Sequence, residues 1–466
     1  MNIVVCVRFV GADLQPFDAA ALECALQSGA TVTVLSLGPA SAAVPLRALT
    51  RLGVSRAILL SDSAFAGSDT LATARALSAA LSRLSYDYVF CGRTSTEGET
   101  AQVGPMLSAL SGLPLFPGVM SFAAAPAPAV TLRTGETLPL PARALCTLER
   151  AYLLRFPSIR SRMGEVEVWD ARALGLPASA VGLAGSPTRV LRSEARAVGE
   201  RHCRMIGAAD LPALLAALPA ERPARAPENA PVAGSEKLPL VMAVGEAVRA
   251  AAASVGDTVV LCRETAPQAV ADAVRAAAPD AVLFPATAEG RVLAPQAAAL
   301  CGAGLCADCT ALSVQNGRLI FTRPAKGGSL TADIVCTTRP AMGSVRCETT
   351  AHTDIVLGCG LGTRARRADC LSLAARLGAR MAASRALVDT GEAPYAEQIG
   401  LTGVNLSCRV YLAVGISGAV QHTCAMEGAD TVIAVNPDSD ARIFSCADYG
   451  VYATLDELLR VFSIAQ

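Results

Sequence analysis

The feature that most constrains the fold is a stretch of sequence that occurs twice. The segment DYVFCGRTSTEGETAQVGP, which begins at Asp87, lines up after a short gap with DAVLFPATAEGRVLAPQ, which begins at Asp280. Each copy has an apolar run, a loop with Glu-Gly and a helix-like stretch with an early proline. A spacing of about 190 residues far exceeds the roughly 20–50 residues of solenoid repeats, so the pattern predicts two similar domains.

Short apolar runs alternate with helix-like stretches around both copies. The first half contains the runs MNIVVCVRFV, ATVTVLSLG, RAILLSD and YDYVFCGR, and the second half repeats this order with LPLVMAVGEAV, GDTVVLCRE and PDAVLFPAT. The alternation predicts an α/β fold with parallel sheets and helices on both faces. Residues 119–170 break the pattern and predict a hairpin-like excursion that rejoins the first sheet.

The chain divides into three α/β units at changes in composition. A passage rich in Pro, Ala and charge around residues 219–236 has no hydrophobic period and predicts a linker. We therefore expect a first domain at 1–218, a linker at 219–236 and a second domain at 237–350. The third unit, at 351–466, contains DIVLGCGLG, RVYLAVGISG and the helix-like TLDELLRVF.

Charge and hydropathy narrow the class of protein. Lys plus Arg and Asp plus Glu both number 40, so no excess of charge argues for nucleic acid as a partner. The N-terminus lacks the pattern of a signal peptide, and no run of 18 or more apolar residues occurs. We expect a cytoplasmic protein that is not embedded in a membrane.

Three of the 16 cysteines have a spacing known from metal sites. Cys301, Cys306 and Cys309 show the C-x4-C-x2-C pattern of one class of iron–sulfur protein, which also needs a fourth thiolate. The alternative is a turn with small buried cysteines, as expected for a reduced intracellular chain. We expect the turn with small buried cysteines and no bound metal.

Three segments of the third unit resemble strand-end loops that bind ligands. They are ASRALVD, EQIGLTG and VGISGAVQH. Gly415 and Gly418 permit tight backbone, and Ser417 and adjacent N–H groups can meet a phosphate. A glycine turn is often only packing, and His422 could equally be a packed, silent histidine. Several polar groups lie at the ends of apolar runs in this one domain, among them Arg385, hydroxyl groups and His422. Together they suit a flavin dinucleotide.

These segments resemble the electron transfer flavoprotein family. Residues 1 to about 218, with FDAAALECAL, CGRTSTEGETAQVGP and RFPSIRSRMGEVEVW, are similar to its β subunit. Residues from about 237 to the end, with TRPAKGGSLTADIVCTTRPAMGSVR, ASRALVDTGEAPYAEQIGLTG and YLAVGISGAVQH, are similar to its α subunit. The resemblance implies a β–α fusion with two homologous doubly wound domains and a C-terminal Rossmann-like FAD-binding domain.

The resemblance also implies residues that bind FAD. In the family the arginine of ASR and the histidine of AVQH lie near the isoalloxazine, and the threonine of QIGLTG lies near its N5. Positive charge and an imidazole there favour a reduced flavin that carries negative charge. The matching positions are Ser384, Arg385, Gln398, Ile399, Gly400, Leu401, Thr402, Ser417, Gly418, Ala419, Val420, Gln421, His422 and Asn436.

A second nucleotide is implied in the β-like half, either AMP or, in members that bifurcate electrons, a second FAD. The alternative for its main loop is an ordinary strand-to-helix turn. The resemblance places this site at Cys6, Asp69, Thr70, Gly92, Glu97, Thr100 and Gln102.

The implied function is electron transfer rather than transformation of a substrate. Electrons would come from flavin dehydrogenases of the acyl-CoA dehydrogenase type, with Ile159 as the anchor of a docking loop, and pass to a downstream acceptor. One alternative is an electron-bifurcating flavoprotein whose second FAD is reduced by NADH. Another is a nucleotide-binding protein without redox work. Cys359 replaces the arginine usual in the family, and the connection before Asp354 is shorter than usual.

Overall fold

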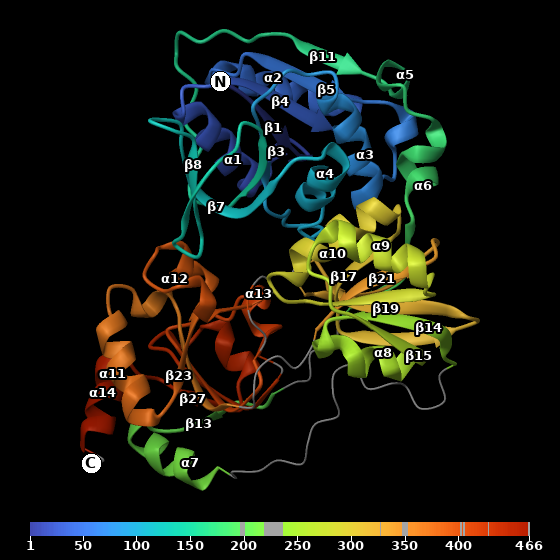
Figure 1. The fold of residues 1–466 in the computed structure, drawn as a ribbon. Coiled ribbons are helices and arrows are strands. Elements are labelled where there is room, and N and C mark those ends of the chain that lie inside the picture. Colours follow the sequence, from blue (N-terminus) through green and yellow to red (C-terminus); the bar gives the residue numbers. More distant parts are fainter. Residues whose placement is uncertain are drawn as a thin grey trace. The chain divides into compact units, whose positions relative to one another are not determined.

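The computed structural model describes residues 1–195, 201–218, 236–326, 328–346, 353–400, 403, 406–426 and 428–464. The chain forms two compact units. The first unit consists of Met1–Glu194, Glu228–Lys326 and Thr331–Cys347. The second unit consists of Ala195–Pro227, Gly327–Leu330 and Glu348–Gln466. Figure 1 shows most of the second unit in orange and red.

The first unit begins with a nine-stranded sheet in the order β11-β5-β4-β1-β6-β10-β7-β8-β9. Its pairings are parallel as far as β7, and β7, β8 and β9 pair antiparallel. The predicted hairpin excursion is confirmed, because β10 returns between β6 and β7. The strands are β1 (Asn2–Val7), β4 (Thr31–Leu37), β5 (Arg56–Leu60), β6 (Tyr88–Gly92), β7 (Leu115–Ala123), β8 (Ala129–Leu132), β9 (Thr137–Pro139), β10 (Ala144–Leu148) and β11 (Val166–Trp169), beside the small ribbon of β2 (Phe9–Val10) and β3 (Asp13–Leu14).

A second parallel sheet in this unit has the order β15-β14-β16-β21-β17. Its connections repeat those of β4-β1-β6-β10-β7, and both sheets shift register at the last pair. The strands are β14 (Leu238–Val244), β15 (Gly256–Cys262), β16 (Ala281–Pro285), β17 (Leu305–Cys309) and β21 (Ala341–Val345). A further sheet has the order β12-β20-β19-β18, formed by β12 (Thr188–Ala195), β20 (Leu330–Cys336), β19 (Arg318–Ala325) and β18 (Ala311–Gln315).

Helices cover both faces of the parallel sheets, as the alternating pattern predicts. One face of the first sheet packs against α1 (Pro16–Gln27) and α2 (Ala43–Leu49) through residues such as Leu22 and Leu46. The other face packs against α3 (Thr70–Leu81) and α4 (Val103–Ser111). That second core continues into α10 (Gly290–Cys301), which lies beside α4 in Figure 1, and into α9 (Pro267–Ala277), which packs against α10. The remaining helices of this unit are α5 (Ala171–Leu174), α6 (Gly182–Gly185) and α8 (Arg249–Val255).

The second unit contains a seven-stranded sheet in the order β13-β27-β26-β25-β22-β23-β24. All its pairings are parallel. The strands are β13 (Arg204–Met205), β22 (Thr353–Cys359), β23 (Arg380–Ser384), β24 (Gln398–Ile399), β25 (Cys408–Val414), β26 (Ala429–Val435) and β27 (Tyr449–Val451). The helices are α7 (Leu211–Ala217), α11 (Arg367–Leu377), α12 (Arg385–Asp389), α13 (Val420–Thr423) and α14 (Leu455–Ile464).

The packing units depart from the predicted domain boundary at residue 218. Residues 204–205 pair with β27, and Leu211 and Leu215 of α7 lie in the core of the second unit. The tail of the predicted first domain therefore belongs by packing to the C-terminal unit, because its apolar side chains are buried there. Apart from Glu236, the predicted linker at 219–236 lies outside the described residues.

Candidate functional site

The strand order of the second unit defines where a ligand is expected. Ligands of open parallel sheets bind at the carboxyl ends of strands, where the direction of the strand order reverses. Here that reversal lies between β22 and β25, since the chain runs from β22 to β23 and β24 on one side and returns to β25 on the other. The residues predicted to bind FAD lie at the ends of β23 and β24 and in the turns after β23, β24, β25 and β26.

Glycines at this edge bring backbone segments into direct contact. A Cβ on Gly360 would lie 2.1 Å from the carbonyl oxygen of Gly415, and the Gly362 N–H donates to that oxygen at 3.0 Å. Gly418 has φ +88°, and a Cβ there would lie 2.2 Å from the nitrogen of Ile443. Only glycine fits these positions, so the edge presents backbone rather than side chains to a ligand.

The turn after β24 packs against the turn that contains α13. Gly400 has φ +131°, and a Cβ on it would lie 2.9 Å from the Gln421 carbonyl oxygen. The predicted FAD segments EQIG and AVQH are therefore neighbours in the structure. Leu401 and Thr402, which the resemblance assigns to the same site, lie outside the described residues.

The remaining predicted residues of this site differ in exposure. Ser384 is buried and accepts a hydrogen bond from the Leu387 N–H at 3.4 Å, which caps α12. Arg385 follows it and pairs with Asp389 at 3.4 Å, with about 30% of its side chain exposed. Gln398 and Ile399 are buried. Ser417, Ala419 and Gln421 are exposed, whereas Val420 is half-buried.

His422 lies in a buried pair with a residue that we did not predict. Its Nε2 lies 2.8 Å from the hydroxyl of Tyr411, which is fully buried in β25. Its Nδ1 is buried and has no hydrogen-bond partner among the described residues. Burial lowers the pKa of His422 to about 4, so the imidazole is neutral at pH 7. The only sequence signal for this pair is a tyrosine within an apolar strand.

Asn436 supports the loop after β25. Its Nδ2 donates to the Ile416 carbonyl oxygen at 3.0 Å, and its Oδ1 accepts from the Asp438 N–H at 3.0 Å. The amide thus ties the end of β26 to the glycine turn. This contact gives Asn436 a role in shaping the predicted FAD loop.

Cys359, which stands where the resemblance implies an arginine, is buried at the end of β22. The nearby arginines have carboxylate partners: Arg364 pairs with Glu392 at 3.4 Å, and Arg366 pairs with Asp369 and Asp456.

The first unit has an equivalent edge between β1 and β6. Asp18 lies there, half-buried, and its carboxylate accepts hydrogen bonds from the backbone N–H groups of Arg8 at 2.8 Å and Gly92 at 3.1 Å. Burial raises its pKa to about 7. A Cβ on Gly92 would lie 2.3 Å from an oxygen of Asp18, so this position needs glycine. Cys6 is buried on β1 beside Cys91 of β6.

The loop between β6 and α4 contains two residues in left-handed backbone conformation. Glu99 and Ala101 have φ +52° and +53°, on either side of the half-buried Thr100. Such strain in non-glycine residues is typical of ligand-binding loops. Glu97 pairs with Arg8 at 2.7 Å, and the buried Gln102 accepts from the Thr70 hydroxyl at 2.6 Å.

Asp69 has a structural role in addition to its predicted place in the nucleotide site. Its carboxylate accepts from the N–H groups of Leu71 and Ala72 at the start of α3. It also accepts from the N–H and hydroxyl of Thr188, at 3.1 and 2.7 Å. The predicted nucleotide residue thus also caps a helix and holds a distant segment.

The segment before β11 exposes an unusual set of apolar side chains. Leu153, Phe156 and Ile159 are 94%, 94% and 98% exposed. Arg155 anchors the segment, since it pairs with the buried Glu23 at 2.8 Å. We call residues 150–164 the exposed loop. Large apolar side chains grouped on a surface mark interaction sites.

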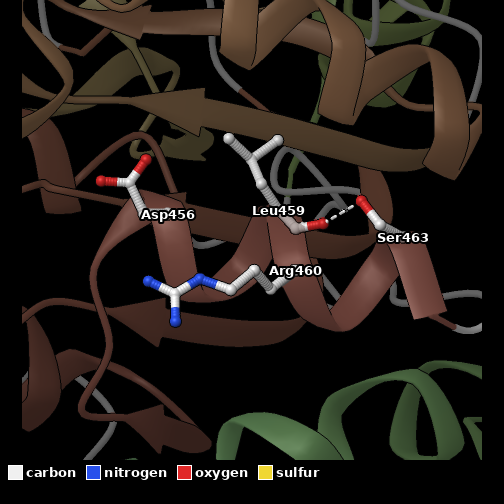
Figure 2. A pocket seen from close by; sticks show the side chains of 4 residues that line it. All are labelled: Asp456, Leu459, Arg460 and Ser463. Atoms are coloured by element: carbon white, nitrogen blue, oxygen red, sulfur yellow. Dashed lines mark hydrogen bonds between the residues drawn. The ribbon is translucent and has the colours of Figure 1, made fainter.

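A pocket lies along α14 of the second unit. Figure 2 shows it along α14, where Asp456, Leu459, Arg460 and Ser463 line a space of about 400 Å³. All four residues lie on one helix, and none belongs to the predicted sites. It offers no convergent set of polar groups from several elements.

The structure locates the three cysteines of the C-x4-C-x2-C pattern. Cys301 ends α10, whereas Cys306 and Cys309 are buried in β17. Within the described ranges no group of three His, Cys, Asp or Glu side chains is arranged to hold a metal ion. No helix in the part of the chain that the structure describes is long and apolar enough to cross a membrane.

Comparison with known proteins matches these regions to one family. The electron transfer flavoprotein domain matches residues 3–137 and 232–355, and the electron transfer flavoprotein FAD-binding domain matches residues 349–427. The chain is 34% identical to electron transfer flavoprotein subunit alpha of Thermoanaerobacterium thermosaccharolyticum in an alignment 240 residues long that covers 42% of this chain and 73% of that protein.

Two further relatives extend the match. Subunit beta from the same organism is 36% identical in an alignment 192 residues long that covers 38% of this chain and 74% of that protein. The acryloyl-CoA reductase electron transfer subunit beta of Anaerotignum propionicum is 30% identical in an alignment 262 residues long that covers 40% of this chain and 71% of that protein. The chain belongs to the electron transfer flavoprotein family and contains its FAD-binding domain.

Proposed function

We propose that the chain is a single-chain electron carrier in which the α-like and β-like parts of the family are fused. The two matches to the electron transfer flavoprotein domain and the relatives named alpha and beta support this proposal. The repeated strand order of the first unit supports two homologous domains. The proposed parts are 1–218 and 237–466.

We propose that FAD binds at the carboxyl edge of β22 to β25. One observation carries this: the buried Nδ1 of His422, next to a backbone edge built from glycines, has no partner in the described structure. A buried polar atom without a partner costs about 1–3 kcal/mol, which a ligand can recover. FAD would supply electron transfer at its isoalloxazine ring. Arg385 and His422 would stabilise negative charge there, and Ser417 and adjacent N–H groups would face phosphate.

The test is to extract and quantify the non-covalent nucleotides of the purified protein. We expect one FAD per chain at this edge, together with AMP or a second FAD in the first unit. The strained loop around Thr100 supports a nucleotide there. Two flavins with NADH-driven reduction would favour the bifurcating alternative. A flavin-free protein that does not take up added FAD would contradict the proposal.

We propose that the exposed loop docks a flavin dehydrogenase that acts on acyl-CoA compounds. The exposure of Leu153, Phe156 and Ile159 supports an apolar contact, and one relative is named as the electron transfer subunit of an acryloyl-CoA reductase. Ile159→Ala should weaken docking, because apolar anchors dominate interface energies. Val44→Ala is the matched control, since Val44 is 77% exposed on α2. If the Ile159→Ala and Val44→Ala variants bound the dehydrogenase equally well, the exposed loop would not be its docking site.

A further inference from the structure

Tyr411 and His422 form a closed pair in the second unit. Tyr411 lies on β25 and His422 on α13, and the hydroxyl oxygen lies 2.8 Å from Nε2. The space for this hydroxyl exists because residue 358 is glycine: a Cβ there would lie 2.0 Å from the tyrosine oxygen. The pair is therefore built into the sheet rather than formed by a mobile surface side chain.

Both members of the pair are neutral. Burial raises the pKa of Tyr411 well above its usual value and lowers that of His422 to about 4. A neutral imidazole has one nitrogen that donates and one that accepts, and the hydrogen bond made by one nitrogen decides the role of the other. The direction of the Tyr411–His422 bond consequently determines what Nδ1 offers to a ligand.

The direction follows from the partners that the two groups have. Among the described residues the Tyr411 hydroxyl has no other hydrogen-bond partner than Nε2. If Nε2 carried the proton, the tyrosine O–H would be a buried donor without an acceptor, at a cost of about 1–3 kcal/mol. With the O–H donating to Nε2, the tyrosine is satisfied and the proton lies on Nδ1. Nδ1–H is then the buried donor that lacks an acceptor.

We propose that Tyr411 is a positioning residue that holds His422 in the Nδ1–H tautomer, so that Nδ1–H donates to an acceptor atom of the bound flavin. This inference rests on the proposed function, because it takes FAD as the ligand. The isoalloxazine offers carbonyl oxygens and ring nitrogens as acceptors, and a donor is worth more where negative charge develops on reduction. The hydroxyl of Tyr411 acts only through the imidazole.

The first measurement is the tautomer itself. Imidazole ¹⁵N spectra of the purified protein should show Nδ1 protonated and Nε2 as an acceptor; the chain has only three histidines, and His422→Gln assigns the signal. This measurement needs no variant of Tyr411. An Nε2–H form in the native protein overturns the proposal, even where FAD is bound.

The second measurement uses Tyr411→Phe, with Tyr452→Phe as the matched control because Tyr452 is 55% exposed in the same unit. Tyr411→Phe should release the Nδ1–H preference, weaken FAD binding about five- to tenfold and lower the flavin midpoint potential. Gly358→Ala, whose Cβ displaces the hydroxyl, should shift the tautomer in the same way. Retention of the Nδ1–H form in Tyr411→Phe overturns the role of the tyrosine. Failure of the native protein to take up FAD overturns the proposed function instead, whatever the tautomer.

Discussion

Gly418→Ala tests whether the glycine turn at the carboxyl edge of the second unit's sheet tolerates a side chain at residue 418. Residue 418 has φ +88°, a conformation that costs an alanine about 1–2 kcal/mol. The added Cβ would also lie 2.2 Å from the nitrogen of Ile443 and 2.6 Å from the carbonyl carbon of Arg442. Because these are backbone atoms, the overlap requires a shift of the chain and adds about 1–3 kcal/mol. We expect a total destabilisation of about 2–5 kcal/mol.

The matched control is Gly391→Ala in the same unit. Gly391 has φ +80°, but a Cβ there would meet nothing within 4 Å, so only the conformational cost of about 1–2 kcal/mol applies. Hydrogen–deuterium exchange of β25 and β26 peptides reports the second unit. The single tryptophan, Trp169, lies on β11 of the first unit, and its fluorescence should report unchanged unfolding there.

The steric argument would be refuted if Gly418→Ala lowered the free energy of unfolding of the second unit by no more than Gly391→Ala does. The same overlap should also weaken FAD binding by Gly418→Ala, because the turn after β25 would move, and leave binding by Gly391→Ala unaltered. A destabilised Gly418→Ala with native FAD affinity would show that the glycine serves folding alone.

Three further outcomes follow from the charges and exposed surfaces. Asp308→Ala should destabilise the first unit by about 3–5 kcal/mol in urea unfolding, because it removes the buried carboxylate that pairs with the buried Arg346 at 2.8 Å, whereas Glu246→Ala in an exposed pair should cost under about 1 kcal/mol. Because the pKa of His422 is lowered in the folded chain, the unfolded chain binds more protons than the folded chain between pH 6.5 and about 4. The free energy of unfolding of the second unit should therefore fall by up to about 3 kcal/mol as the pH falls through this window. In His422→Gln this dependence of stability on pH should disappear. Ile159→Ala should leave thermal unfolding unchanged, since the side chain is 98% exposed, while weakening dehydrogenase docking measured by calorimetry.

Local pattern was sufficient to predict much of the fold. The alternation of apolar runs and helix-like stretches predicted the parallel sheets, the excursion at 119–170 and the terminal helix, because period and turn residues are local properties. The repeat around Asp87 and Asp280 predicted the shared strand order of the two sheets in the first unit. The carboxyl-edge loops could be predicted because glycine is required where backbones touch.

Long-range partners could not be predicted in this way. Residues 204–205 are too few to show a period, yet they form the edge strand of the C-terminal sheet. Asp69 has the sequence pattern of a helix cap, but nothing local indicates its bonds to Thr188. In the sequence nothing distinguishes Tyr411 from the other residues of its apolar run. Only the folded structure shows that its hydroxyl pairs with His422. These contacts depend on tertiary packing, which a single sequence does not display.

The structure changes the electrostatic reasoning about the candidate FAD site. The family pattern suggests cations around the flavin, but His422 is neutral at pH 7 because burial lowers its pKa to about 4. The resemblance implies an arginine where this chain has Cys359, and Arg385 pairs with Asp389 at 3.4 Å. With less positive charge, a neutral Nδ1–H donor has a larger share in stabilising a reduced flavin, since a preorganised hydrogen bond in a buried site acts without a net charge. That share makes the tautomer of one histidine, and the tyrosine beside it, a determinant of the potential of this carrier.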